Sequence, residues 1–212
     1  MLAAAGLLTT GCARNPILQS VSGIATRTSG LPRDVEIDRA TIAKIPYATI
    51  RARFGDGLTS LLLLRAYDGP ELDWVASDNT LLVTSSGRLV KTVGFPEDLR
   101  RVAFEGADPL ASAPQALTGP ARYGMKYDLM TTALNVVHVE SELEPVGPET
   151  ITIADIDFKT MRLRERCRAA FVKWTFENEY WVDAYDGFVW RSRQHFARSL
   201  PPLTIEVLKP AA

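Results

Sequence analysis

The sequence predicts an all-β fold in which an antiparallel meander and hairpins form a single sandwich or barrel-like domain with little helix. Residues 173–197 indicate this most plainly, because aromatic and charged side chains alternate there with the two-residue period of a strand. Residues 47–95 add closely spaced turn signals, a pattern typical of sandwiches and barrels. The period of an amphipathic helix does not appear in that second block.

The composition fits one globular domain and gives no electrostatic case for binding nucleic acid. The chain has 212 residues, of which 46% are hydrophobic and 23% charged, and these are ordinary globular values. Lys and Arg number 24 against 25 Asp and Glu, for a net charge of −1. The basic surface that nucleic acid requires is therefore not expected. No apolar run reaches the roughly 20 residues that cross a bilayer as a helix.

The first twelve residues read as the end of a secretory signal, because they are apolar, small and uncharged. Leu8–Cys12 resembles the lipobox of bacterial lipoproteins, so we predict a signal-peptide remnant over residues 1–12 with lipid attachment at Cys12. The alternative is a frayed apolar tail with an incidental cysteine. Thr9 stands where an aliphatic residue is usual, and no Lys or Arg precedes the apolar stretch. We therefore expect the true start codon to lie upstream.

Residues 13–33 are predicted to be a flexible tether, because Asn, Pro, Ser, Thr and Gly recur there without a period. The β domain is expected over residues 34–209, with Arg39–Ala43 as a short strand or bridge into the sheet. A five-stranded meander follows: Tyr47–Phe54, Leu58–Ala66, Leu72–Ser77, Leu81–Thr84 and Leu89–Val93. The apolar run Leu61–Leu64 predicts a central strand that is covered on both faces.

A long loop is predicted over about residues 97–120, with a short helix at Glu97–Val102 and an Ala-, Pro- and Gly-rich connection after it. A loop of this length is either functional or mobile. The strands resume beyond it, with a turn predicted at Pro145–Pro148: Ala121–Thr132, Ala133–Glu144, Ile151–Phe158, Lys159–Ala170, the hairpin of residues 173–197, and Leu203–Leu208.

Asp186-Gly187 supplies the turn of the hairpin, because glycine adopts a positive φ without steric cost. An odd number of loop residues would match the aromatic faces of the two strands. Glu177 and Glu179 would then lie opposite Arg193 and Arg191. A four-residue loop, Ala184–Gly187, is the alternative.

Two acidic sets are candidates for chemistry, and we predict that both are solvated. Asp155 and Asp157 stand two apart on a predicted strand, a spacing that can hold a divalent ion and resembles the metal motif of some glycosyltransferases. No βαβ pattern accompanies it. The second set is an acidic strand face that would have to reach across a cleft to act as a glycosidase: His138, Glu140, Glu142 and Glu144. We predict no catalytic residue, metal or cofactor.

Aromatic side chains can stack on sugar rings, and Trp181 and Tyr185 are the candidate ligand contacts, because they lie out of phase with the apolar face or on the turn. Trp174 and Trp190 lie in phase and are expected in the core. Cys167 is predicted to be an unpaired strand cysteine. The basic strand Arg162–Arg168 is expected at a solvated sheet edge, with contact to an acidic polymer as the alternative.

Several segments together resemble the YjbF/GfcB lipoproteins of exopolysaccharide and group 4 capsule operons. The resemblance covers most of the chain after the tether. It rests on Ile45–Ala48, Leu61–Leu64, Trp74 before Ser77–Thr80, Thr84–Pro96, Glu179–Asp183, Asp186-Gly187 and Val189–Gln194.

This resemblance implies a non-enzymatic outer-membrane lipoprotein, facing the periplasm, that assists secretion or assembly of an exopolysaccharide or capsule. Ala13 after Cys12 favours the outer membrane, by resemblance to the sorting rule of Gram-negative lipoproteins. The expected partners of the protein are the membrane (through the lipid anchor), an extracellular polysaccharide and other export proteins. The alternatives are a periplasmic polysaccharide-modifying enzyme that uses the acidic strand residues, and a generic envelope lipoprotein with a structural role.

Overall fold

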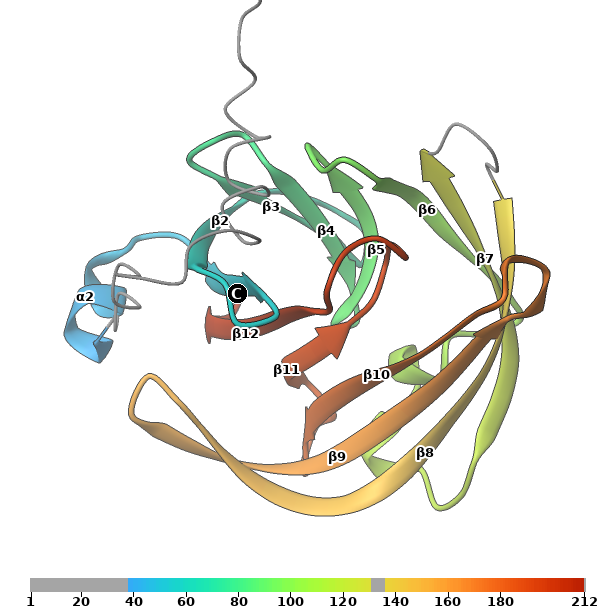
Figure 1. Cartoon of the computed structure of the whole chain (residues 1–212). Coiled ribbons are helices and arrows are strands. Elements are labelled where there is room, and N and C mark those ends of the chain that lie inside the picture. The colour runs from blue at the N-terminus through green and yellow to red at the C-terminus, as the bar shows by residue number, and fades with distance from the viewer. Residues whose placement is uncertain (1–37, 131–135, 212) are drawn as a thin grey trace, which may run out of the picture. The chain divides into compact units, whose positions relative to one another are not determined.

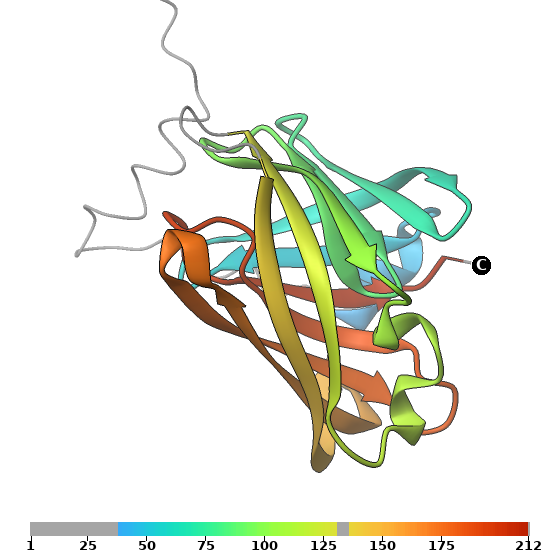
Figure 2. The ribbon, with the colours of Figure 1, turned by 90° about the vertical axis from the view of Figure 1, so that its right-hand side faces the viewer.

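The computed structural model describes residues 38–130 and 136–211, all within one compact unit, Pro32–Ala212. It confirms the predicted fold class, because twelve antiparallel strands form one sheet in the order β5-β4-β3-β2-β1-β12-β11-β10-β9-β8-β7-β6. The sheet curls until it is nearly closed (Figures 1 and 2). The predicted signal remnant, the lipid attachment at Cys12 and the tether lie outside the described residues and stay predictions.

The five-stranded meander of the first half is confirmed. Its strands are β1 (Thr49–Phe54), β2 (Thr59–Asp68), β3 (Glu71–Ala76), β4 (Leu81–Ser85) and β5 (Arg88–Val93). Strand β2 lies between β1 and β3, and its leucines point alternately to two faces. Leu62 is buried in the main core, whereas Leu61 packs on a smaller cluster on the other face. The central position predicted for Leu61–Leu64 is thus confirmed.

The second half holds seven further strands and three short 3₁₀ turns. They are β6 (Asp98–Glu105), η1 (Pro109–Ala111), η2 (Pro114–Ala116), β7 (Ala121–Met130), β8 (Val136–Ile153), β9 (Ile156–Ala169), η3 (Ala170–Val172), β10 (Trp174–Asp183), β11 (Val189–Gln194) and β12 (Leu203–Lys209). Strand β12 pairs with β1 as well as with β11. The last strand of the described sheet therefore joins the two halves of the chain.

Two short segments have the opposite structure to the one predicted. Residues 39–44 form helix α2 (Arg39–Lys44) rather than a strand, and the backbone N–H of Thr41 donates to the capping Asp38 carboxylate at 2.7 Å. Conversely, the helix predicted at Glu97–Val102 is wrong, because β6 pairs with β7 over these residues. The long loop therefore begins only after Glu105, and the two 3₁₀ turns lie within it.

The turn predicted at Pro145–Pro148 is also wrong. Strand β8 runs for 18 residues through both prolines, with a bulge between Pro145 and Gly147. Its pairing with β7 ends at Leu143, so beyond this point the strand has a free edge, where a proline without an N–H is tolerated. The chain reverses instead at Ala154-Asp155, both with positive φ. Asp155 thus lies in a turn and not beside Asp157 on a strand.

The hairpin of residues 173–197 is confirmed as β10 and β11, but its predicted register is wrong by two residues. Glu179 lies opposite Arg193, and Trp181 opposite Arg191. The backbone N–H of Asp183 donates to the Phe188 carbonyl at 2.7 Å. The loop is therefore the four-residue one, Ala184–Gly187, that was the alternative. A bulge beside Trp181 shifts the register by one residue within the hairpin. Trp190 consequently lies outside the main core.

The two edge strands of the sheet, β5 and β6, meet at one end through side chains. The Asp98 carboxylate accepts from Thr92 Oγ1 at 2.9 Å and from the backbone N–H of Gly94 at 3.1 Å. The backbone N–H of Leu99 donates to Thr92 Oγ1 at 2.9 Å. The edge position predicted for Arg162–Arg168 is wrong, because β9 lies between β8 and β10 in the sheet interior.

Candidate functional site

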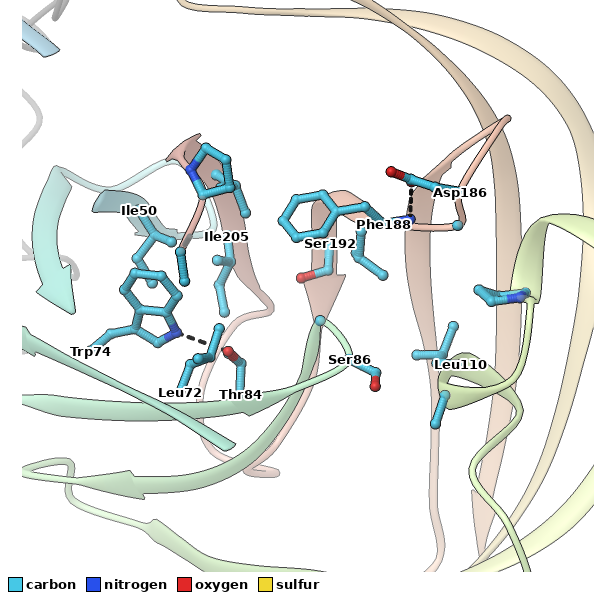
Figure 3. Close-up of a pocket in the computed structure, with 18 of the residues that line it drawn as sticks. Ile50, Leu72, Trp74, Thr84, Ser86, Leu110, Asp186, Phe188, Ser192 and Ile205 are labelled. Atoms are coloured by element: carbon cyan, nitrogen blue, oxygen red, sulfur yellow. Dashed lines mark hydrogen bonds between the residues drawn. The ribbon is translucent and has the colours of Figure 1, made fainter. Parts of the chain in front are cut away.

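A cavity of about 470 Å³ opens among three connections of the sheet: the β4–β5 turn, the loop after β6 and the β10–β11 turn. This volume lies in the usual range of ligand pockets, roughly 300–1,000 Å³. Figure 3 shows side chains from these connections facing side chains of β1, β3 and β12. The lining includes Ile50, Leu72, Trp74, Thr84, Ser86, Leu110, Pro114, Asp186, Phe188, Val189, Ser192, Ile205 and Val207.

The polar groups of this lining are mostly bonded within the protein. Trp74 Nε1 donates to Thr84 Oγ1 at 2.8 Å, and the backbone N–H of Phe188 donates to Asp186 Oδ1 at 2.9 Å (Figure 3). Ser192 Oγ accepts from Gln194 Nε2 at 2.8 Å. The cavity therefore presents mainly carbon to its interior.

The β4–β5 turn forms one wall and lies directly against β11. Ser86 and Gly87 both have positive φ, as a tight hairpin turn requires. A Cβ atom at Gly87 would lie 2.3 Å from Val189 Cβ. Gln194 fixes the turn, because its side chain donates to the Gly87 carbonyl and accepts from the backbone N–H of Leu89, both at 2.9 Å.

Behind this wall lies a buried ion pair between Arg88 at the start of β5 and Glu165 on β9. The side chains of Arg88 and Glu165 are 1% and 0% exposed. Arg88 Nη1 donates to both oxygens of Glu165 at 3.0 and 2.9 Å. Its Nε and Nη2 donate to the two oxygens of Asp108 at 2.9 and 3.1 Å. Asp108 begins the segment that carries Leu110, so this ion pair holds two walls of the cavity.

Neutral donors complete the coordination of the Glu165 carboxylate. Asn178 Nδ2 donates to Glu165 Oε2 at 2.8 Å and the Tyr180 hydroxyl does so at 3.1 Å. The Tyr123 hydroxyl donates to the other oxygen. We call these groups, with Arg88 and Asp108, the buried polar network.

The network keeps its central pair charged. Burial alone would raise the pKa of Glu165, but the Arg88 guanidinium and the hydrogen bonds from Arg88, Tyr123 and Asn178 lower it below its ordinary value. Burial likewise acts to lower the pKa of Arg88, but Glu165, Tyr180, Tyr123 and Asp108 together outweigh it, so this pKa is raised. Burial raises the pKa of Tyr180, which stays a neutral hydroxyl.

Sequence reasoning missed this network, although a signal was present. Glu165 lies within Arg162–Arg168, which the sequence predicts to be a solvated basic strand. In the structure it shares the inward face of β9 with Leu163, Cys167 and Ala169, all buried. An acidic residue in the middle of an apolar set with period two indicates a buried carboxylate that needs a cationic partner.

The two predicted ligand contacts, Trp181 and Tyr185, differ in their exposure to solvent. Trp181 is 8% exposed and packs with Ile42 of α2, and the guanidinium carbons of Arg162 and Arg191 lie 5.5 and 5.6 Å from its ring centre. Tyr185 is 93% exposed on the β10–β11 turn, next to Asp186 of the cavity. Its role, and that of Trp181, stay predictions, but only Tyr185 offers a large free surface.

Most of the acidic side chains in the two sets interact with neighbouring strands. Glu140 pairs with Arg168 at 3.2 Å and Glu144 with Arg166 at 2.8 Å, while Glu142 pairs with Arg122. In the set of Asp155 and Asp157, Asp157 accepts from Thr152 Oγ1 at 2.7 Å.

Other predicted features can be placed on the described residues. No group of three or more His, Cys, Asp and Glu side chains in that part of the chain is arranged to hold a metal ion. Cys167 is buried and free, and burial raises the pKa of its thiol. Among residues 38–130 and 136–211, none of the helices has the length and apolar character needed to span a membrane.

Comparison with known proteins places the chain in a family. Residues 16–208 match the family described as "Group 4 capsule polysaccharide lipoprotein gfcB, YjbF". The chain is 29% identical over 182 residues to the "Uncharacterized lipoprotein GfcB" of Escherichia coli K12, covering 84% of each protein. It is 24% identical over 177 residues to the "Uncharacterized lipoprotein YjbF" of the same organism, covering 84% of this chain and 82% of that one.

A solved structure shares the fold. The crystal structure of the hypothetical lipoprotein YmcC from Escherichia coli K12 matches with a TM-score of 0.75 and 24% identity, over 95% of this chain and 100% of that chain. The same curled sheet is therefore found in a solved protein. With the family match over most of its length, the chain belongs to the YjbF/GfcB family of group 4 capsule polysaccharide lipoproteins.

Proposed function

We propose that this protein is a lipid-anchored outer-membrane protein, facing the periplasm, that assists secretion or assembly of an exopolysaccharide or capsule without catalysing a reaction. The observation that carries the proposal is the match of residues 16–208 to a family named for capsule polysaccharide lipoproteins. The lipobox-like Leu8–Cys12 supports the anchor, and Ala13 supports the outer membrane.

The engagement of the acidic side chains supports a non-catalytic role. A glycosidase uses two carboxyl groups on either side of the scissile bond, one of them with a raised pKa. Glu140, Glu142 and Glu144 are instead paired with arginines on adjacent strands. Among the described residues that line the cavity, Asp186 is the single carboxylate, and it accepts a hydrogen bond from its own turn.

The test is a clean deletion strain in which polysaccharide is measured separately in the medium and in the periplasm. We expect polymer to accumulate inside the cell. The wild-type gene should restore secretion, and a Cys12→Ala gene should not, because a free periplasmic protein no longer lies at the membrane. Unchanged polymer in both compartments would remove the pathway assignment.

The same assay addresses the alternative of a polysaccharide-modifying enzyme. Glu140→Gln, Glu142→Gln, Asp155→Asn and Asp157→Asn, each introduced singly, should secrete polymer as wild type does. Protein abundance is measured in each strain as the control. Loss of secretion at normal abundance in any one of them would favour catalysis.

A further inference from the structure

Among the described residues, the lining of the cavity carries few polar side chains, Thr84, Ser86, Asp186 and Ser192, and three of them already hydrogen-bond within the protein. In the described part of the chain, the buried side-chain atoms without a hydrogen-bond partner are Gln115 Oε1, Asp128 Oδ1, Arg164 Nε and Trp181 Nε1. None of these residues lines the cavity. Sites that select a polar ligand present buried donors and acceptors whose partner the ligand supplies. A sugar ring would here give up its hydrogen bonds to water with few replacements, which is unfavourable.

The charges around the cavity also exclude an anionic ligand. Among the described residues of the lining, Asp186 is the charged one. The nearby Arg88 guanidinium is fully engaged by Glu165, Asp108 and two tyrosine hydroxyls. A uronate, phosphate or fatty-acid carboxylate would find no cation in this lining. The interior therefore suits an uncharged group that needs no hydrogen bonds.

We propose that the cavity binds the hydrocarbon chain of a lipid. The aliphatic walls from Ile50, Leu110 and Ile205 would enclose the chain, and its head would remain at the mouth beside Asp186, which favours a neutral or cationic head. Each methylene transferred from water to the apolar lining adds to the free energy of binding. This inference goes beyond the proposed function, which concerns a polysaccharide, and a lipid-anchored protein lies where such chains are abundant.

The first experiment uses 11-bromoundecanol, a neutral chain whose bromine quenches tryptophan fluorescence, and the full chain carrying Cys12→Ser. Trp74 lines the cavity, so we expect saturable quenching that is largely lost in Trp74→Phe. Trp190, which lies outside the lining and has its ring centre 4.0 Å from that of Phe158, provides the control: Trp190→Phe should keep the quenching. Quenching that does not saturate, or that survives Trp74→Phe, overturns the proposal.

Two lining variants and two matched controls locate the binding. Leu72→Glu places a charge in the cavity and Ala111→Trp obstructs its rim, and both positions retain solvent exposure. We expect each to weaken bromoundecanol binding by at least about tenfold, because burying an ionised carboxylate or losing the cavity removes the apolar contacts. Leu58→Glu and Ala116→Trp, exposed and outside the lining, should bind as the parent does. Circular dichroism confirms folding of every variant, and equal binding by a folded Leu72→Glu protein overturns the proposal.

Further measurements distinguish the class of ligand and the origin of the hydrocarbon chain. Farnesol tests an isoprenoid chain, and maltoheptaose tests a sugar. Binding of maltoheptaose in competition with bromoundecanol overturns the proposal. If the acylated protein extracted from membranes does not bind bromoundecanol and the Cys12→Ser protein does, the chain comes from the protein's own anchor. If both bind, it comes from a separate lipid. These measurements use purified protein, so they can fail or succeed independently of the secretion assay.

Discussion

The contact between Arg88 and Glu165 shows how one buried ion pair can determine the position of a turn. Removing two charges from water costs several kcal/mol per ion, and the pair recovers this only when its hydrogen bonds are complete. Here Asp108, Tyr123, Asn178 and Tyr180 complete them. We infer that the network selects one arrangement of the cavity walls from the many that apolar packing alone would permit.

Replacement of Arg88 by Met should lower the free energy of unfolding by about 3–5 kcal/mol, because it leaves the Glu165 carboxylate buried without its cation. Urea unfolding followed by fluorescence measures this. The matched control is Arg168→Met on the same sheet, whose pair with Glu140 is largely exposed and is expected to contribute at most about 1 kcal/mol. Similar values for the two variants would contradict the account of the network.

Individual site residues were the least predictable features of this chain. The burial of Glu165 depends on which face of β9 turns inward, and the run of arginines around it made that strand look solvated. Trp181 lies out of phase with the apolar face, as predicted, but it is buried there because α2 packs Ile42 on the same cluster. The exposure of Tyr185 was easier to predict, because a residue on a turn usually lies at the surface.

Among the elements, the β4–β5 turn meets a conformational and a steric constraint at the same residue. Gly87 has a φ of +77°, and an added Cβ would overlap Val189. Gly69, on the β2–β3 turn, has a φ of +57° but nothing within 4 Å of the Cβ position. Gly69 thus meets only the requirement for a positive φ, whereas Gly87 also meets a steric one.

Gly69→Ala should lower the free energy of unfolding by about 1–2 kcal/mol, the usual cost of a left-handed conformation for a residue with a side chain. Gly87→Ala should cost clearly more than Gly69→Ala, because Val189 or the turn must also move. Thermal and urea unfolding of the two purified variants measure the difference. Equal effects would show that the turn does not lie against β11 as described.

The strands that were predicted well are those flanked by unambiguous turns. Gly55–Gly57, Asp68–Pro70 and Ser86-Gly87 divide residues 47–95 into the observed meander. The sequence predicted a strand where α2 forms and a helix where β6 forms, because each segment is short and its structure depends on partners elsewhere. Helix α2 packs Ile42 against Leu208 and Trp181, and β6 pairs along β7. No local period distinguishes such segments.

At the scale of the molecule, the charged state of Glu165 links the stability of the curled sheet to pH. Its pKa is lower in the folded protein than its ordinary value of 4.5. The unfolded chain therefore binds a proton first as the pH falls. The stabilisation is present above about pH 4.5 and is lost as the pH falls through the lower folded value.

The free energy of unfolding should consequently fall less steeply below about pH 4.5 in Glu165→Gln than in the parent protein. The variant is expected to be less stable at neutral pH, because Arg88 then lacks its anion. Urea titrations across acidic and neutral pH provide both curves, and Glu140→Gln, on an exposed pair, serves as the control. Parallel curves for parent and Glu165→Gln would contradict the lowered pKa.

The ladder between β1 and β12 also has a consequence for biosynthesis. Every other neighbouring pair in the described sheet joins strands that follow one another in the chain, so those pairs can form as hairpins while synthesis continues. Strand β1 has only β2 beside it until residues 203–209 have emerged from the ribosome. The nascent chain thus carries an unpaired backbone edge through most of its translation, the period in which a chaperone has most to protect.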